Sequence, residues 1–319
     1  MEPKPKTIFT LNFRSLLGLV CLVGLGLSLT GCSWIGFRGE DDSANRSGPS
    51  GEENTESVTF AEKRLLELHE DQTSLLARYQ ANPGGTAQDS MEMQVVNLVN
   101  AYEVYLNDNP DDTTARILLA KFLIEVGQFE EAIRHYLIVD QMDPDIPVVK
   151  QQIGNYLAET GRYMAALPYF INATDLAPNE PLYYYQLAGL LYEYQSFYIE
   201  DGFYTREELE SEMVNALSRA VQLAPDELGY WRMLGELFYE LDNPDWQTAL
   251  NVWDKLHSRI EDPLDKQAVQ LHRARVLLRL GETDQAFDLA MQVSEPALQT
   301  SRQTLLNEIQ QSQTLLSLP

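Results

Sequence analysis

The chain of 319 residues contains 48 acidic and 23 basic residues, which gives a formal net charge of −25 at pH 7. Nucleic-acid binding requires basic surface that neutralises phosphates, so this composition argues against a DNA or RNA partner. The two cysteines are Cys21 and Cys32. Cys21 lies in an N-terminal apolar segment that we expect to be removed. A single remaining thiol excludes a disulfide within the mature chain and a metal site built from several cysteines.

The N-terminus has the pattern of a secretory signal peptide. Three basic residues precede residues 15–30, which are almost wholly apolar and too short to cross a membrane comfortably as a helix. The sequence Leu29-Thr30-Gly31-Cys32 then resembles the lipobox of bacterial lipoprotein precursors. This resemblance implies cleavage after Gly31 and a lipid on the Cys32 thiol, and two or more acyl chains would give a stable membrane anchor. An ordinary signal peptide and an uncleaved anchor are the alternatives.

Residues 1–31 are therefore expected to be a signal peptide, and residues 32–57 a lipidated cysteine followed by a flexible linker. The linker is polar, acidic and rich in Gly and Ser, so it cannot bury enough apolar surface to fold. From residue 58 the composition predicts helices. Apolar spacing favours one amphipathic helix that ends before Asn82 and a second over about residues 92–106. Residues 58–112 are thus expected to form N-terminal helices and a possible half repeat.

The next segment contains an internal repeat with a period of 34 residues. Five positions recur at this spacing, namely Gly127/Gly161, Phe129/Tyr163, Ala132/Ala166, Tyr136/Phe170 and Pro144/Pro178. The period and the residue types resemble the tetratricopeptide repeat (TPR), a helix–turn–helix unit. The glycines are expected to close the first helix, the alanines to allow close helix approach, Tyr136 and Phe170 to fill space between neighbouring units, and the prolines to end the second helix.

The TPR resemblance implies an all-α, right-handed helical-repeat solenoid over residues 113–295. The expected units are 113–146, 147–180, 181–227, 228–263 and 267–295, followed by a capping helix at 296–319 that covers the last apolar face. The third unit is longer, because Pro178 and Pro225 are 47 residues apart and the excess over one period is 13 residues. We expect its first helix to run long, a loop to project near residues 200–203, and Thr205 with Glu208 to form a capping box.

No enzyme signature is present. The four histidines are dispersed, and the chain has no metal-binding spacing, no phosphate-binding glycine loop and no nucleophile elbow. We therefore expect neither catalysis nor a cofactor nor a metal site.

A helical solenoid instead offers a concave surface to a peptide or a partner helix. Inward-facing positions carried over from the TPR family give Lys121, Asn155, Tyr185, Tyr192, Arg232, Tyr239 and Arg275. The basic residues among them could capture a carboxylate, or they could simply balance charge between neighbouring helices. Some TPR proteins bind a C-terminal carboxylate with a clamp of Lys, Asn and Arg. This chain has Ile117 in place of the first Lys and Lys121 in place of the Asn, so the clamp is not carried over.

The insertion in the third unit is rich in Tyr and Phe. Tyr198, Phe203 and Tyr204 are its candidate partner-binding residues, because aromatic side chains bury much area at interfaces. The alternative is that these rings pack the enlarged unit.

These features predict a membrane-anchored TPR lipoprotein that acts as a protein-interaction scaffold or assembly factor in the bacterial cell envelope. Its partner would be another envelope protein or a peptide bound in the concave groove. In a two-membrane bacterium the expected location is the outer membrane, facing the periplasm, and otherwise the outer face of the plasma membrane. The alternatives are a solute- or glycan-binding lipoprotein that uses a pocket at the insertion, and a purely structural spacer.

Overall fold

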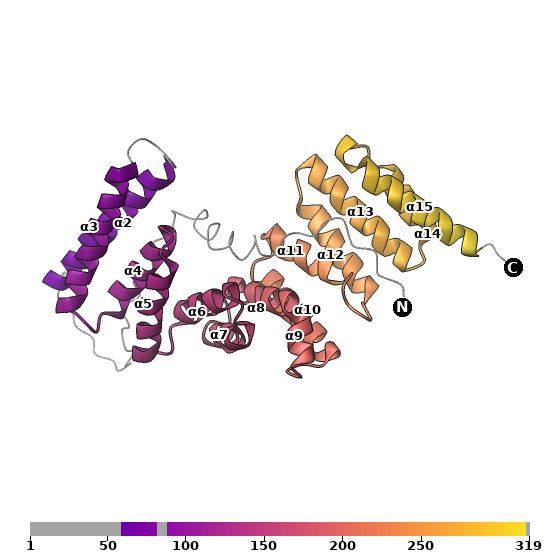
Figure 1. Cartoon of the computed structure of the whole chain (residues 1–319). Helices are drawn as coiled ribbons and strands as arrows, with labels where there is room; N and C mark the ends of the chain where they lie inside the picture. The colour runs from indigo at the N-terminus through magenta and orange to yellow at the C-terminus, as the bar shows by residue number, and fades with distance from the viewer. Residues whose placement is uncertain (1–58, 82–87, 317–319) are drawn as a thin grey trace, which may run out of the picture. The chain divides into compact units, whose positions relative to one another are not determined.

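The computed structural model describes residues 59–81 and 88–316, which form helices without any strand in these ranges (Figure 1). The expected signal peptide, Cys32 and the linker lie outside the described residues. None of the described helices combines the length and apolar character needed to cross a membrane. The chain divides into two compact units, residues 1–162 and 163–319. Within each unit, helices that follow one another in the chain pack together, which confirms the all-α helical-repeat fold.

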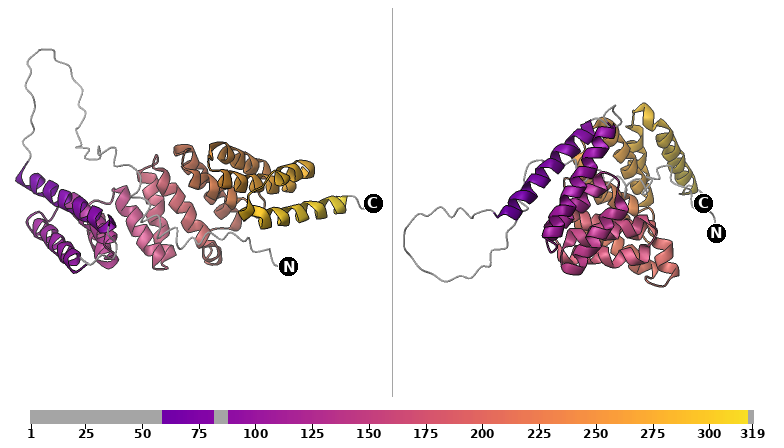
Figure 2. Two further views of the ribbon diagram at one scale, coloured as in Figure 1. Left: turned by 90° about the horizontal axis from the view of Figure 1, so that it is seen from above. Right: turned by 60° about the vertical axis from the view of Figure 1, so that its left-hand side comes forward.

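The first unit starts with a long helical hairpin and continues with shorter helices. Its helices are α2 (Phe60–Ala81), α3 (Gln88–Asp108), α4 (Thr113–Glu125), α5 (Phe129–Met142) and α6 (Pro147–Glu159). α2 and α3 lie side by side, and both contact α4 (Figures 1 and 2). The two predicted N-terminal helices are thus confirmed. Their apolar faces share one core with α4, in which Tyr102, Leu119 and Phe122 are fully buried.

The repeated glycines end the first helix of each pair. Gly127 and Gly161 have φ angles of 79° and 74°, in the left-handed region that favours glycine. The Gly127 N–H donates to the Ile124 carbonyl at 3.0 Å, and the next N–H, from Gln128, reaches back to Leu123 at 2.7 Å. This pair of backbone hydrogen bonds is a Schellman motif. The predicted role of these glycines is confirmed.

The second unit contains the remaining helices. They are α7 (Tyr163–Leu176), α8 (Pro181–Glu193), α9 (Gln195–Glu200), α10 (Arg206–Leu223), α11 (Leu228–Leu237), α12 (Trp246–Arg259), α13 (Pro263–Arg279), α14 (Thr283–Met291) and α15 (Gln299–Leu316). α8 packs on α10, α11 on α12, and α13 on α14. α15, yellow in Figures 1 and 2, packs on α14 and α13 and buries Leu305 and Ile309 there. The helix expected at the C-terminal end is present.

The turns that precede α4, α8 and α11 each contain the same kind of hydrogen bond, in which a proline carbonyl accepts from a side chain six residues later. The carbonyl of Pro178 accepts from the Tyr184 hydroxyl at 3.3 Å, and that of Pro225 accepts from Trp231 Nε1 at 2.8 Å. In both cases the donor lies six residues after the proline. Arg116, six residues after Pro110, donates to that carbonyl at 3.0 Å. A proline carbonyl is free to accept at such a turn, and the bond fixes the turn against the helix that follows.

The small residues of the repeat lie where helices approach closely. Ala132, Ala166, Ala220, Ala249 and Ala286 are all at most 1% exposed. The aromatic residues Tyr136, Phe170 and Trp253 are buried as well, whereas Phe129 is 46% exposed. The predicted packing roles of both residue types are confirmed.

Two expectations differ from the structure. The first helix of the third unit was expected to run long, but α8 ends at Glu193 and a separate short helix, α9, follows. The reason is packing, because Tyr194, Phe197 and Tyr198 all turn toward the ring of Tyr163 on α7. In addition, α13 begins at Pro263, so its start lies four residues before the expected start of the fifth unit at 267.

Candidate protein-binding surface

The structure places the seven predicted groove residues in two separate groups. Tyr185 and Tyr192 lie on α8, Arg232 and Tyr239 on or just after α11, and Arg275 on α13, all within the second unit. Lys121 on α4 and Asn155 on α6 belong to the first unit. α8, α11 and α13 are the first helices of three successive pairs. We call the surface formed by these five residues of the second unit the first-helix surface.

Tyr239 lies at the centre of an aromatic cluster. Its hydroxyl donates to the backbone carbonyl of His272 at 3.3 Å and lies 3.3 Å from His272 Nδ1. The His272 ring stacks on Trp253, with ring centroids 4.2 Å apart and an interplanar angle of 11°. Gly235 makes room for this arrangement, because a Cβ atom there would lie 2.5 Å from the Trp253 ring. A glycine on α11 therefore sets the position of the cluster.

Arginines create a positive potential beside this cluster. Burial and, to a lesser extent, the charges of Arg275 and Arg232 lower the pKa of His272 to about 3, so its imidazole is neutral at pH 7. Arg232 has only a long contact of 3.9 Å with Asp265. Among the described residues, no carboxylate lies within ion-pair distance of Arg275. An arginine without an ion-pair partner is unusual on a chain of net charge −25, where acidic residues are about twice as numerous as basic ones.

One carboxylate, that of Glu236, also lies near Arg232, Tyr239 and Tyr192 of the first-helix surface. Burial raises the pKa of Glu236, and the nearby Arg232 charge opposes this shift. Tyr192 is half-buried, and burial together with Glu240 and Glu236 raises its pKa. The Tyr192 hydroxyl therefore remains protonated at neutral pH and can donate a hydrogen bond.

Tyr185 is more buried than we expected for a groove residue. It is 9% exposed and packs against Tyr230, with ring centroids 4.7 Å apart. Burial and the Glu236 carboxylate raise its pKa to about 12. The structure therefore corrects Tyr185 from a groove residue to a packing residue. Most of its side chain lies in the contact between α8 and α11, and only its exposed edge can touch a partner.

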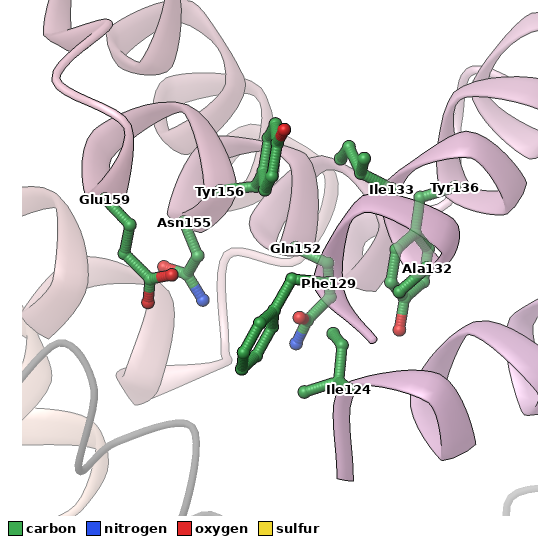
Figure 3. A pocket seen from close by; sticks show the side chains of 9 residues that line it. All are labelled: Ile124, Phe129, Ala132, Ile133, Tyr136, Gln152, Asn155, Tyr156 and Glu159. Carbon is green, nitrogen blue, oxygen red and sulfur yellow. The ribbon is translucent and has the colours of Figure 1, made fainter. Parts of the chain in front are cut away.

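The first unit contains a shallow pocket between α5 and α6 (Figure 3). The side chains that line it are Ile124, Phe129, Ala132, Ile133, Tyr136, Gln152, Asn155, Tyr156 and Glu159. Its volume of about 20 Å³ accommodates about one water molecule, whereas ligand pockets typically have about 300–1,000 Å³. The geometry therefore does not favour a small-molecule site at this position.

Asn155 and Lys121 have different environments within the first unit. Asn155 is 4% exposed, and its Oδ1 atom is buried and accepts no hydrogen bond from the described residues. It was expected at a surface, and the structure places it in the wall of the pocket. Lys121 is exposed at its side chain, yet partial desolvation by the surrounding protein lowers its pKa.

The three predicted partner-binding residues of the insertion differ in their exposure to solvent. Tyr198 is fully buried and donates its hydroxyl hydrogen bond to the Tyr163 carbonyl at 2.9 Å, so the structure corrects it to a core residue. Tyr204 is half-buried, and its ring meets that of Tyr198 edge to face. Phe203 is 58% exposed. Because Tyr198 is inaccessible, it cannot line the solute pocket that the alternative prediction required.

His272 belongs to the aromatic cluster although the sequence predicts no binding role for it. It is one of four dispersed histidines in the sequence, but it lies three residues before Arg275 and therefore on the same side of α13. That spacing was the available signal. Within the described ranges, no group of three or more His, Cys, Asp and Glu residues is arranged to hold a metal ion.

No family model and no curated protein matches this sequence. Among solved structures, the chain is similar to YrrB, a TPR protein with an unusual peptide-binding site, at 14% identity and a TM-score of 0.49, covering 69% of this chain and 100% of that one. It is also similar to PilF of Pseudomonas aeruginosa (14% identity, TM-score 0.48, 77% and 98% covered). A third similar structure is that of the type IV pilus biogenesis factor PilW, at 15% identity and a TM-score of 0.43, covering 74% of this chain and 98% of that one. These similarities are low, so the fold is established by the helix pairs described above.

Proposed function

We propose that this protein is a scaffold or assembly factor of the bacterial cell envelope, anchored by a lipid on Cys32 and binding another envelope protein through the first-helix surface. The anchor is supported by the lipobox pattern of Leu29-Thr30-Gly31-Cys32. In a two-membrane bacterium we propose the outer membrane, facing the periplasm, as its location. In a one-membrane organism the same anchor corresponds to the outer face of the plasma membrane.

The observation that carries the binding proposal is the position of Arg275. It lacks a carboxylate partner among the described side chains, and it lies near the neutral His272 and Tyr239, whose pKa values respond to its charge. Arg and Tyr are enriched among residues that dominate binding energy. A hydrogen bond to a charged group contributes about 1.5–3 kcal/mol. We therefore propose that Arg275, with Arg232, binds a carboxylate of an extended partner segment.

Charge reversal tests this binding mode. A photo-crosslinking amino acid at position 192 would be used in living cells to trap whatever contacts the first-helix surface. We expect Arg232→Glu with Arg275→Glu to abolish the crosslinked product. The matched control reverses Arg64 and Arg134, which are exposed arginines on α2 and α5. Undiminished crosslinking by the first variant, or equal loss in the control, would reject the proposed binding surface.

A separate experiment tests the anchor. We expect Cys32→Ser to move the protein from the membrane fraction to the aqueous fraction, because the serine hydroxyl does not replace the thiol as the lipid acceptor. Helix content by circular dichroism serves as the control for folding. Continued dependence on detergent for extraction of the serine variant would show that the lipid on Cys32 is not the anchor.

A further inference from the structure

We propose that the insertion between α8 and α10 is a second docking surface, which binds an arginine-containing basic segment of a partner protein. We call it the insertion face and define it by Phe197, Glu200, Asp201, Phe203 and Glu207. This inference is independent of the first-helix surface, which is proposed to bind a carboxylate.

The insertion face is held against α7 by ring stacking and hydrogen bonds. The Tyr163 ring on α7 stacks on Tyr194 and Phe197, with centroid distances of 5.1 and 4.9 Å. The Tyr163 hydroxyl donates to Asp201 Oδ2 at 3.2 Å, and the buried Tyr198 donates to the Tyr163 carbonyl at 2.9 Å. Contacts from both sides thus fix α9 on α7. A surface that is already ordered loses little conformational entropy when a partner binds.

The end of α9 presents an aromatic ring to solvent. Gly202 has a φ of 72°, and the following N–H, from Phe203, returns to the Tyr198 carbonyl at 2.9 Å in another Schellman motif. Tyr198 already supplies the buried contact that holds this turn. Phe203 is nevertheless 58% exposed, and Phe197 is 46% exposed. Two phenylalanine rings therefore remain partly in water on an ordered segment.

The charge around these rings identifies the kind of partner. Residues 193–212 contain seven acidic residues and one basic residue, whereas the whole chain has about two acids per base. The one base, Arg206, is engaged with Glu210 at 2.9 Å and with Asp242 at 3.5 Å. Glu200 and Glu207 are exposed, and neither forms an ion pair with any described side chain. The insertion face therefore carries uncompensated negative charge.

An arginine side chain matches both properties of the insertion face. Its planar guanidinium stacks on an aromatic ring and at the same time pairs with a carboxylate. A second copy of this chain, with a net charge of −25, would be repelled, and so would an anionic lipid surface. These comparisons favour a basic segment of a different protein as the occupant.

The test uses a fluorescent peptide of alternating Arg and Gly, titrated into the purified full-length chain in a neutral detergent at low salt. A peptide with citrulline in place of arginine has nearly the same shape without the charge. We expect the arginine peptide to bind at least tenfold more tightly than the citrulline peptide. We also expect Phe203→Ser, and separately Glu200→Gln with Glu207→Gln, to weaken its binding at least tenfold.

Helix α14 provides a matched control. Phe287 is 42% exposed there and lies between the exposed Asp284 and Asp288, but no stacked aromatic platform supports it among the described contacts. We expect Phe287→Ser, and Asp284→Asn with Asp288→Asn, to change binding less than twofold. Equal losses in both sets would mean nonspecific attraction to an acidic chain and would overturn the proposal. Equal affinity for the citrulline peptide would also overturn it.

The same titration separates the two proposed surfaces. Arg232→Glu with Arg275→Glu should leave binding of the arginine peptide intact, because these residues lie outside the insertion face. A failure of the arginine peptide to bind would therefore reject the insertion face and leave the crosslinking test of the first-helix surface unaffected.

Discussion

Gly235→Ala tests the packing that positions the aromatic cluster of the first-helix surface. The added Cβ atom would lie 2.5, 2.6 and 3.0 Å from three atoms of the Trp253 ring. Trp253 is fully buried and stacked on His272, so the ring cannot move without disturbing that stack. Overpacking of a core typically costs about 1–3 kcal/mol, and such close contacts belong at the upper end of that range. Alanine also gains about 1 kcal/mol in helix propensity. The net expected loss of unfolding free energy is about 2 kcal/mol.

Gly229→Ala on the same helix is the matched control. Nothing lies within 4 Å of a Cβ atom at Gly229, so only the propensity gain remains and the variant should be as stable as the parent or slightly more stable. Thermal unfolding followed by circular dichroism measures the difference. A unit of this size shifts its Tm by about 2–4 °C per kcal/mol, so Gly235→Ala should unfold about 4–8 °C lower. Equal melting temperatures for the two variants would refute the steric argument. Trp253→Phe should relieve the strain in Gly235→Ala, and independent effects of the two changes would contradict direct contact.

Three further predictions concern buried polar groups. Tyr198→Phe should lower the unfolding free energy by about 1 kcal/mol, because it removes the hydrogen bond to the Tyr163 carbonyl, and urea titration measures it. Lys150→Ala should cost about 3–5 kcal/mol in the same assay, because Lys150 and Asp140 form a 2.6 Å ion pair with side chains only 10% and 16% exposed. His272 binds a proton in the unfolded state near its ordinary pKa but in the folded state only near 3, so stability should fall as the pH decreases from 6.5 toward 3. His272→Gln should remove about 2 kcal/mol of this loss of unfolding free energy at pH 5. Thermal unfolding of the variant and the parent at pH 5 and pH 7 measures the difference. An equal loss of stability at pH 5 in both proteins would contradict the lowered pKa of His272.

The regular part of the fold could be predicted from the sequence because its determinants are local or periodic. Gly127 and Gly161 end helices through hydrogen bonds to carbonyls only a few residues earlier. The capping box of Thr205 and Glu208 is likewise contained in one helical turn. Alanines at a fixed period indicate close helix contacts regardless of which helix is opposite. Such patterns specify helix pairs without any knowledge of the remaining chain.

The candidate site could be predicted only in part, because burial depends on contacts distant in sequence. Arg232, Tyr239 and Arg275 do lie on or next to the first helices of their pairs. Tyr185 and Tyr198 were expected to be available to partners, but their environments are set by Tyr230 and Tyr163, respectively. His272 is part of the site through Trp253, a residue of the preceding helix. No spacing rule within a single helix identifies such neighbours.

The insertion shows most clearly why local reasoning fails. Between Tyr192 and Glu200 the sequence contains no proline or glycine, so helical periodicity predicts that α8 continues. The chain instead ends α8 at Glu193, because Tyr163, about thirty residues earlier, offers a ring on which Tyr194 and Phe197 stack. This stacking does not involve Phe203, whose ring remains 58% exposed. A segment that departs from the repeat, is held by specific contacts and still exposes an aromatic ring is better explained by recognition of a partner than by stability alone.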